Sequence, residues 1–452
     1  MKHIFSILAL LGVLLSIAQE PLSLSDAISL GLERNFDIRI EQKNVLVAET
    51  NNNWGEAGRY PTITLNLNQN NSINDNVKTA SPFQLQDITV SNSVNPGANI
   101  NWTIFDGFKV NMTKRRLEQL QAESEGNASI VIANNLQGIV LGYYLATLEQ
   151  ERLREFKKQL ILSRDKYAYV KAGYDIGTSV TSDLLLEEGN FLTDSVNFIN
   201  QQLAFRNAVR NLNVLIGETE VDKSYVFTDD LNVVFPDYQY EDLEAKLFNN
   251  NVDLQKQYIS QSLLGTGIQL AKAERYPTLS LSSGLSQNRS RVDLSNAQFP
   301  GQDGTSSPGP ADPLTARTDS YFANFTLSFT LFNGGKINRA IKNVIVQEDI
   351  GNIRIEKMEN SLQRDLMEAY DRYQVRKQLY GINVKREDAA KTNLEITSEK
   401  FKNGSINSFD YRIVQNNYLS ASILKLQSLF NLLDSKIELM RLTGGLIAEY
   451  NQ

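Results

Sequence analysis

The sequence contains no cysteine, and its single histidine is His3. Without cysteine the chain forms no disulfide, and thiol catalysis and cysteine-ligated metal sites are excluded. Without further histidines it also lacks the side chains on which Ser–His catalysis and most zinc sites depend. A formal net charge of −7 gives no support for nucleic-acid binding. We therefore expect no enzyme, no catalytic residue, no cofactor and no metal site.

Long apolar runs are almost absent. The one clear run is Ile4–Ile17, which follows Lys2 and precedes the small-x-small sequence Ser16-Ile17-Ala18. It is shorter than the roughly 20 residues that a membrane-spanning helix needs. The pattern is typical of a secretory signal peptide at residues 1–18, and a membrane anchor is the alternative. No cysteine follows for lipidation, so we expect an exported protein without a spanning helix.

Proline occurs only 10 times and glycine 26 times in 452 residues, and their placement reveals an internal duplication. The segment AGRYPTITLNLN at 57–68 recurs as AERYPTLSLSSG at 273–284, an offset of 216 residues. Farther along, WTIFDGFKVN at 102–111 recurs as FTLFNGGKIN at 329–338, an offset of 227 residues. Ordered repetition of this kind indicates repeated structural units. The predicted parts are a first repeat at 19–217, a linker at 218–238, a second repeat at 239–444 and a tail at 445–452.

Each repeat is predicted to open with a helical stretch of about 35 residues that ends at a proline. Ser25-Asp26 is the candidate cap of the first stretch. Pro61 and Pro277 remove a backbone donor and disfavour the α conformation of the preceding Tyr60 and Tyr276. These four residues are therefore the predicted breaks from helix to strand.

After each break, apolar and polar residues alternate strictly. The alternation occupies residues 63–68 and 98–104 in the first repeat, and 279–282 and 324–331 in the second. Runs of about ten residues with one apolar and one uncharged polar face are typical of transmembrane β-strands. A soluble β-sandwich is the alternative, which the signal peptide disfavours. Four strands cannot close a membrane barrel, so the protomers are expected to associate.

Glycine marks the passage from the second strand of each repeat into a helix. Asp106 and Asn333 are candidate N-caps, and Gly107, Gly334 and Gly335 allow the chain to turn sharply. Aromatic residues accompany these strand ends, either as a belt at a membrane interface or as ordinary packing. They are Tyr60, Trp102, Phe105, Phe108, Tyr276 and Phe332.

Two very long helices follow these turns. Residues 109–172 and 336–403 contain no proline, which predicts helices about 95 Å long, as in a coiled coil or a helical barrel. Return helices are expected at 181–216 and 408–443. The second of these carries apolar residues at steps of three and four, which favours coiled-coil packing. They are Ile423, Leu426, Phe430, Leu433, Ile437 and Met440.

This ordered and duplicated set of motifs resembles the TolC family of outer-membrane efflux proteins over essentially the whole mature chain. The resemblance implies a mixed α/β membrane protein that forms a homotrimer. Its twelve-stranded transmembrane β-barrel, with four strands from each protomer, would continue as a long α-helical coiled-coil tunnel in the periplasm. The polar stretches 69–96 and 287–320 would be extracellular loops.

The resemblance also implies a function. The trimer would sit in outer-membrane lipid as a passive exit duct, docked to a periplasmic adaptor and to an inner-membrane pump such as an RND or ABC transporter. Drugs, other small molecules or secreted proteins would be the cargo, and the sequence does not choose among them. A secreted or surface coiled-coil protein with a structural or adhesive role, without channel activity, is the alternative.

In this family the two helix hairpins form a gated periplasmic entrance. The hairpin turns here contain Gly177-Thr178 and Gly404-Ser405, and six residues after each glycine comes an acid, Asp183 or Asp410. By the resemblance these two acids and Tyr174 belong to the gate. The alternative is that each acid simply favours the start of its helix through the helix dipole.

The chain departs from the family at the same entrance. Ile413 replaces a second acid, Ile406 replaces a gating arginine, and Phe401 replaces a hydrogen-bonding tyrosine. A gate built from these residues would be more apolar than that of the family. Arg412 and Lys402 lie close by in the sequence and are candidates for replacement ion pairs.

Overall fold

The computed structural model describes residues 20–80, 83–229, 233–300 and 306–446. The predicted signal peptide lies outside the described residues, as does most of the predicted tail. The chain divides into two compact units. The sheet unit comprises Ala48–Gln121 and Ser260–Gly351, and the helical unit comprises the rest.

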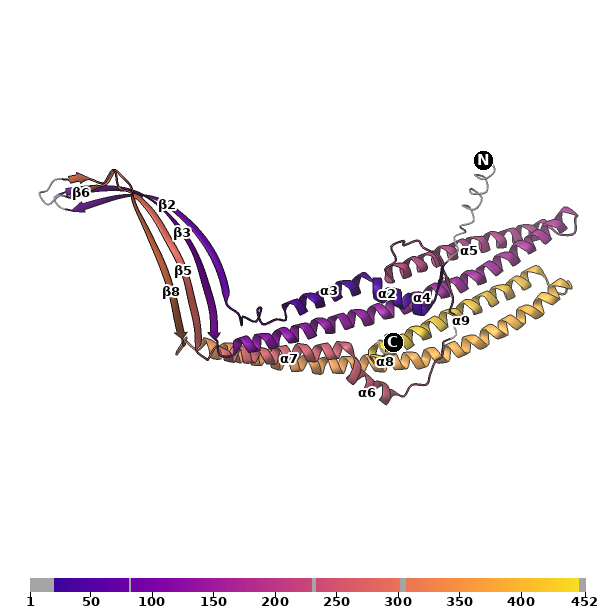
Figure 1. Ribbon diagram of the computed structural model, residues 1–452. Coiled ribbons are helices and arrows are strands. Elements are labelled where there is room, and N and C mark those ends of the chain that lie inside the picture. The colour runs from indigo at the N-terminus through magenta and orange to yellow at the C-terminus, as the bar shows by residue number, and fades with distance from the viewer. Residues whose placement is uncertain (1–19, 81–82, 230–232, 301–305, 447–452) are drawn as a thin grey trace, which may run out of the picture. The chain divides into compact units, whose positions relative to one another are not determined.

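Four antiparallel strands form the main sheet of the sheet unit, in the order β2-β3-β5-β8 (Figure 1). Their bounds are Thr62–Ala80 for β2, Phe83–Phe105 for β3, Thr278–Asp293 for β5 and Leu314–Ser328 for β8. A small hairpin of β6 (Gln298–Pro300) and β7 (Ser306–Pro308) extends the link between β5 and β8. Within the described protomer, β2 and β8 are the two edges of this sheet.

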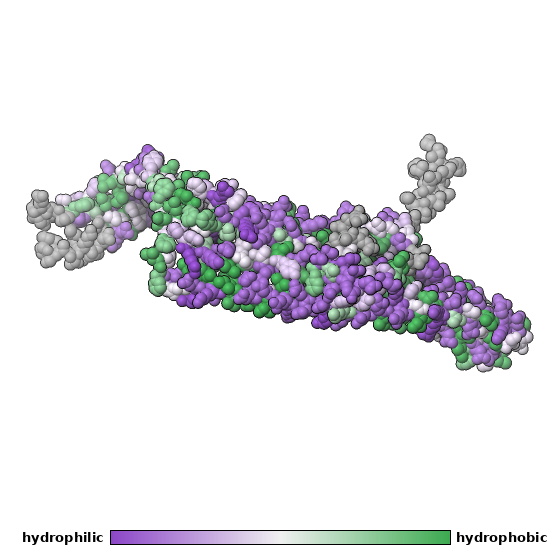
Figure 2. All heavy atoms as spheres, turned by 90° about the horizontal axis from the view of Figure 1, so that it is seen from below, coloured by the Kyte–Doolittle hydropathy of each residue, from purple (hydrophilic) through white to green (hydrophobic). Residues whose placement is uncertain are grey.

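The predicted alternation gives this sheet one apolar and one polar face. On one face Ile63 lies beside Ile100, and Leu65 beside Ala98. On the other face Thr62 lies beside Asn101. Ile63, Leu65 and Ile100 are exposed, and Figure 2 shows hydrophobic residues gathered over the strands. The four predicted strands and their phase are confirmed, although β8 ends at Ser328, before the predicted end of its alternation at residue 331.

The predicted loops are wrong in extent. The polar stretch 69–96 belongs almost wholly to β2 and β3, and stretch 287–320 contains the end of β5, all of β6 and β7, and the start of β8. Here asparagine, serine and threonine occupy both faces of the strands. The period of two therefore disappears from the sequence, although the backbone ladder continues from Leu67–Pro96 to Ala80–Phe83.

The helices occur in the same order in both repeats. In the first repeat they are α2 (Leu24–Arg34), α3 (Phe36–Asn51), α4 (Lys109–Asp175) and α5 (Thr181–Leu215). In the second repeat they are α6 (Tyr240–Asn250), α7 (Val252–Ala273), α8 (Lys336–Lys402) and α9 (Ser408–Leu442). The bounds of the four long helices agree with the prediction within three residues. In the helical unit, a two-stranded parallel sheet joins β1 (Glu20–Leu22) to β4 (Tyr225–Phe227).

Two details of the predicted opening helix are wrong. The N-cap is Ser23, two residues earlier, and Asp26 completes a capping box with it. The proline does not end the helix: α3 ends at Asn51 and α7 at Ala273, before Pro61 and Pro277. Each proline instead directly precedes the first residue of a strand, where a missing backbone donor is tolerated.

A buried asparagine breaks each opening helix in two. Asn251 donates from Nδ2 to the carbonyl oxygen of Leu442 at 2.9 Å, and its Oδ1 accepts from the Leu254 N–H at 2.9 Å. Asn35 makes the corresponding bond to Leu215, at 2.8 Å. Next to Asn251, Gly444 has φ +70°, and a Cβ there would lie 2.5 Å from the backbone oxygen of Asn250. Each asparagine therefore ties the start of a repeat to its end.

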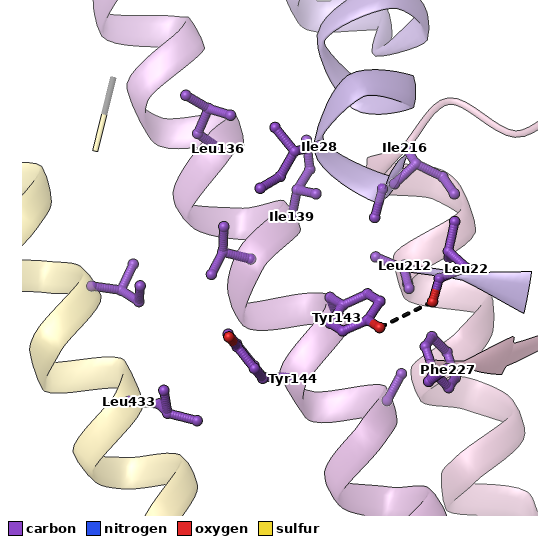
Figure 3. Packing of buried hydrophobic residues seen from close by; sticks show 14 of the residues in the cluster. Leu22, Ile28, Leu136, Ile139, Tyr143, Tyr144, Leu212, Ile216, Phe227 and Leu433 are labelled. Carbon is purple, nitrogen blue, oxygen red and sulfur yellow. Dashed lines mark hydrogen bonds between the residues drawn. The ribbon is translucent and has the colours of Figure 1, made fainter. Parts of the chain in front are cut away.

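The core of the helical unit lies around α4 (Figure 3). Leu136, Ile139 and Tyr143 are fully buried against α2 and α5, and the Tyr143 hydroxyl donates to the Leu22 carbonyl oxygen at 3.0 Å. Among the described residues, α4 is the one helix long and apolar enough to cross a membrane. Its apolar residues instead account for this core, since 44% of the apolar window is buried.

The asparagine bonds predict a loss of stability on substitution. Asn251→Ala removes a donor and an acceptor that are buried with their partners, which costs about 2 kcal/mol. A lowered midpoint of urea denaturation, followed by circular dichroism, would show this. Gly381→Ala is the control, because its added Cβ meets nothing within 4 Å in a helix. Equal midpoints for Asn251→Ala and the wild type would contradict the role of Asn251.

Candidate functional site

The two helix hairpins of the helical unit end in turns of one design. Gly177 and Gly404 have φ values of +80° and +69°. The N–H of Thr178 donates to the Gly173 carbonyl at 2.8 Å, and that of Ser405 donates to the Lys400 carbonyl at 2.9 Å. These bonds satisfy carbonyl groups at the end of a helix, and a positive φ favours glycine. The predicted turn residues therefore lie at the ends of the hairpins.

Asp183 and Asp410 lie in the first turns of α5 and α9. Both are exposed, and among the described residues neither forms an ion pair. The N–H of Asp410 donates to Oδ1 of Asn407, the N-cap of α9, at 2.8 Å. A carboxylate in the first turn is stabilised by the helix dipole. Both acids are therefore free for other contacts.

Both cations suggested for replacement ion pairs are paired, but not with Asp410. Lys402 bonds Glu399 on its own helix at 2.7 Å, and the side chain of Arg412 turns to Asp194 on α5. Neither cation reaches Asp410. Of the other predicted gate residues, Tyr174 and Ile413 are exposed, whereas Ile406 is half-buried.

Phe401 takes part in an unexpected cluster between the hairpins. Its ring stacks on that of Tyr411 with centroids 4.7 Å apart. The ammonium of Lys166 lies over both rings, 5.1 Å from the Phe401 centroid and 5.3 Å from that of Tyr411. Such cation–π contacts stabilise an ammonium most when it is shielded from water.

Lys166 is also the centre of a buried ion pair. Its Nζ lies 3.1 Å from Oε1 of Glu187, and the two side chains are 5% and 1% exposed. Ser408 of α9 donates its hydroxyl to Glu187, and its carbonyl accepts from Lys166 at 3.0 Å. Burial lowers the pKa of Lys166, and the nearby Glu187 carboxylate opposes that shift. The ion pair of the first hairpin thus holds the first turn of α9.

A second buried pair lies close to the first. Arg412 of α9 makes two hydrogen bonds of 2.7 Å to the carboxylate of Asp194 on α5, and Gln159 donates to the same carboxylate at 3.3 Å. A two-bonded guanidinium–carboxylate contact is strong and directional. Removing one member would leave a buried charge, at a cost of about 3–5 kcal/mol.

We name the two pairs and Ser408 the interhairpin network. Sequence reasoning missed it because Lys166 and Ser408 are 242 residues apart. One signal was present on α5, where Glu187, Asp194 and Gln201 repeat every seven residues. Polar residues on one heptad position indicate a polar seam between helices. Gln201 continues the seam by donating to Glu149 at 2.5 Å.

The predicted strand ends lie in the sheet unit. Oδ1 of Asp106 accepts from the Val110 N–H at 3.3 Å, so it caps the start of α4 from outside the helix. For Asn333, the backbone carbonyl accepts from Lys336, at 3.4 Å. Gly107 and Gly334 both have positive φ, and so does Phe108, which occupies the place of Gly335 in the other repeat.

Trp102 donates its indole N–H to the Arg59 carbonyl oxygen at 2.9 Å, and the other five aromatic residues at these ends divide into two groups. Phe105, Phe108 and Tyr276 pack edge to face, with centroids 5.4 and 6.3 Å apart. For them ordinary packing is therefore at least part of the role. Tyr60 and Phe332 are largely exposed. A membrane-interface role for these two residues stays a prediction.

Known proteins share this architecture. The chain resembles the outer membrane channel CmeC of Campylobacter jejuni with a TM-score of 0.73 and 16% identity, over 93% of this chain and 85% of that one. MtrE of Neisseria gonorrhoeae, an outer membrane channel in its open state, has a TM-score of 0.65 and 16% identity, over 94% of this chain and 89% of that one. VceC, an outer membrane protein of Vibrio cholerae, has a TM-score of 0.67 and 12% identity, over 93% of this chain and 96% of that one. No curated protein matches the sequence.

The family model for outer membrane efflux proteins matches residues 27–218 and 245–445. Together these two segments make up most of the chain, and the resemblance drawn from the sequence motifs is confirmed. The predicted outer-membrane location and exit-duct function follow from this family, as does the absence of enzymatic activity. The chain therefore belongs to the outer membrane efflux protein family.

Proposed function

We propose that three copies of this chain form one closed channel, whose sheets join edge to edge into a barrel of twelve strands. The main observation behind this proposal is the four-stranded sheet. It has an exposed apolar face, and its two edge strands, β2 and β8, are unpaired within the described protomer. In hydrocarbon each unpaired backbone group costs several kcal/mol. Closure by other copies pairs these groups, and the Asn/Ser/Thr face then lines the lumen.

Two matched stripes in the helical unit support the same assembly. Each consists of exposed side chains at steps of three and four, the spacing of a coiled-coil seam. The α5 stripe is Leu185, Gly189, Leu192, Val196, Ile199 and Leu203. The α8 stripe is Val375, Leu379, Ile382, Arg386, Ala389, Asn393 and Ile396.

The stripes match in position and nearly in length. Leu185 comes eight residues after Gly177, and Ile396 comes eight residues before Gly404. Figure 1 shows α4 and α9 between α5 and α8. A head-to-tail ring would thus bring the α5 stripe of one copy against the α8 stripe of the next, antiparallel and level with it. Such an interface joins two different surfaces of the same protein, and it closes a ring when the rotation from one copy to the next returns to the first copy.

Disrupting the α5 stripe should dissociate the ring. The double variant Leu192→Glu, Ile199→Glu places two carboxylates in the proposed seam, where burial of unpaired charge is costly. We expect the trimer mass of the wild type in detergent, measured by light scattering, to fall to that of a monomer. Tyr169→Glu, an exposed aromatic of α4 outside both stripes, is the control. A double variant with the mass of a trimer would refute the seam.

At the hairpin ends, three copies of Asp410 would surround the entrance and attract cations. Asp410→Ala should then raise the concentration of a trivalent cation that half-blocks single-channel current by about tenfold, or about 1.4 kcal/mol of attraction. Glu399→Ala, which removes an acid already paired with Lys402, is the control. The same block in Asp410→Ala as in the wild type would assign Asp410 to helix capping alone.

The gate roles of Asp183, Tyr174, Phe401 and Ile413 remain part of this proposal.

A duct of this kind needs an energy source from elsewhere. We therefore propose that the hairpin ends dock to a periplasmic adaptor and, through it, to an inner-membrane pump of the RND or ABC class. Family membership supports this proposal, and the cargo would follow the pump. Cross-linking in native membranes should capture both partners with the channel. Capture of the channel with neither partner, while it remains a trimer, would contradict the proposed docking.

A further inference from the structure

On β5 and β8 the apolar face of the main sheet ends in a basic group. Arg289 and Arg291 lie on β5, and Arg317 lies on β8. We call these three residues the arginine cluster. They share the face of Leu285 and Tyr321, because each is an even number of residues from the apolar residue on its own strand. All three side chains are exposed.

The register places like charges side by side. Arg289 and Arg317 are direct cross-strand partners, and Arg291 follows Arg289 on the same face. Cross-strand partners have Cβ atoms about 5 Å apart, and two cations in such positions destabilise a sheet. This arrangement therefore calls for an anion.

Carboxylates on this face do not balance the cluster. Asp319 accepts from Arg317, with an ion-pair distance of 3.0 Å, and from Gln287 at 2.7 Å. Asp293 accepts from the Ser295 N–H at 3.0 Å. Among the residues that the structure describes, Arg289 and Arg291 form no ion pair within 4 Å, although Asp319 also attracts Arg289 and Asp293 attracts Arg291 electrostatically. Three guanidinium groups thus face two carboxylates, and two of the three have their donors available.

The cluster lies at the edge of an apolar band of membrane height. On this face of β3, exposed apolar residues run from Val94, the cross-strand partner of Arg289, to Ile104. Ten residues of strand span about 33 Å, which a tilt of about 40° reduces to about 25 Å, the height of a barrel's lipid-facing band. Arg317 lies four residues beyond Tyr321, about 10 Å higher by the same geometry. That is the depth of lipid headgroups.

The direction of the strands identifies the leaflet. Strand β5 starts at Thr278, just after the end of α7, and runs toward Asp293. The arginine cluster lies near that distal end, away from the helices. In the proposed channel, whose helices extend into the periplasm, the distal end faces the cell exterior. The cluster therefore lies at the outer leaflet.

We propose that the arginine cluster binds the phosphate groups of an anionic lipid in the outer leaflet. The proposal rests on the proposed channel, which sets this face toward lipid. A guanidinium offers paired N–H donors that fit phosphate oxygens. One phosphate between Arg289 and Arg317 would accept from both and remove their repulsion, while Tyr321 packs against the acyl region below.

The test uses the purified full-length trimer in detergent, titrated with lipid A as the phosphorylated lipid. Bound lipid is counted by native mass spectrometry. The wild type should retain lipid A, and Arg289→Ala, Arg291→Ala should weaken binding at least about tenfold. Arg115→Ala, Arg116→Ala removes two exposed arginines of α4 and is the charge-matched control. The control should bind lipid A as the wild type does.

Further arms separate lipid from other anions. Phosphatidylcholine should not compete, and inorganic phosphate at millimolar concentration should not displace lipid A. Displacement by inorganic phosphate would overturn the lipid assignment in favour of a free-anion site. Equal lipid A binding by both double variants would overturn the cluster itself. The mass and conductance of each variant are measured separately and test the proposed channel. A protein that is trimeric and conducts ions but does not bind lipid A would therefore refute only this inference.

Discussion

A backbone N–H or C=O group that faces hydrocarbon without a partner costs several kcal/mol, and this constraint governs the whole chain. Four strands leave the edges of β2 and β8 open, so the sheet cannot enter a membrane alone. Once three copies close the barrel, their helices must also meet. The matched stripes on α5 and α8 are the features of the helical unit that meet this second requirement.

Local signals made the architecture predictable from sequence. The alternation after Pro61 and Pro277 is visible residue by residue, because each strand has one lipid-like and one polar face. The long helices were equally clear, since residues 109–172 and 336–403 lack proline. Repetition confirmed each signal by a second copy. Positive φ at Gly177 and Gly404 bore out the turns.

The rest depended on contacts between distant residues. Beyond the apolar band asparagine, serine and threonine interrupt the apolar face, so the outer parts of β2 and β3 were taken for loops. The break at Asn251 follows from a bond to Leu442, 191 residues away, which no local pattern reveals. For the same reason the sequence could not name the partner of Arg412, because Asp194 is 218 residues distant. The gate roles of Asp183 and Asp410 are not decided by position alone.

The duplication is not symmetrical where the hairpins end. In the second repeat, the places of Lys166, Glu187 and Asp194 are taken by Asn393, Val414 and Ala421, with the offset of 227. An interhairpin network can therefore form only once in each protomer, between its first hairpin and α9. The junction proposed between protomers is mostly apolar instead, with Arg386 and Asn393 as the polar members of the α8 stripe. Buried ion pairs need a specific hydrogen-bond geometry, whereas hydrophobic burial is non-directional and tolerates sliding of helices. Movement at the entrance would accordingly concentrate between protomers, with each pair of hairpins moving as one body.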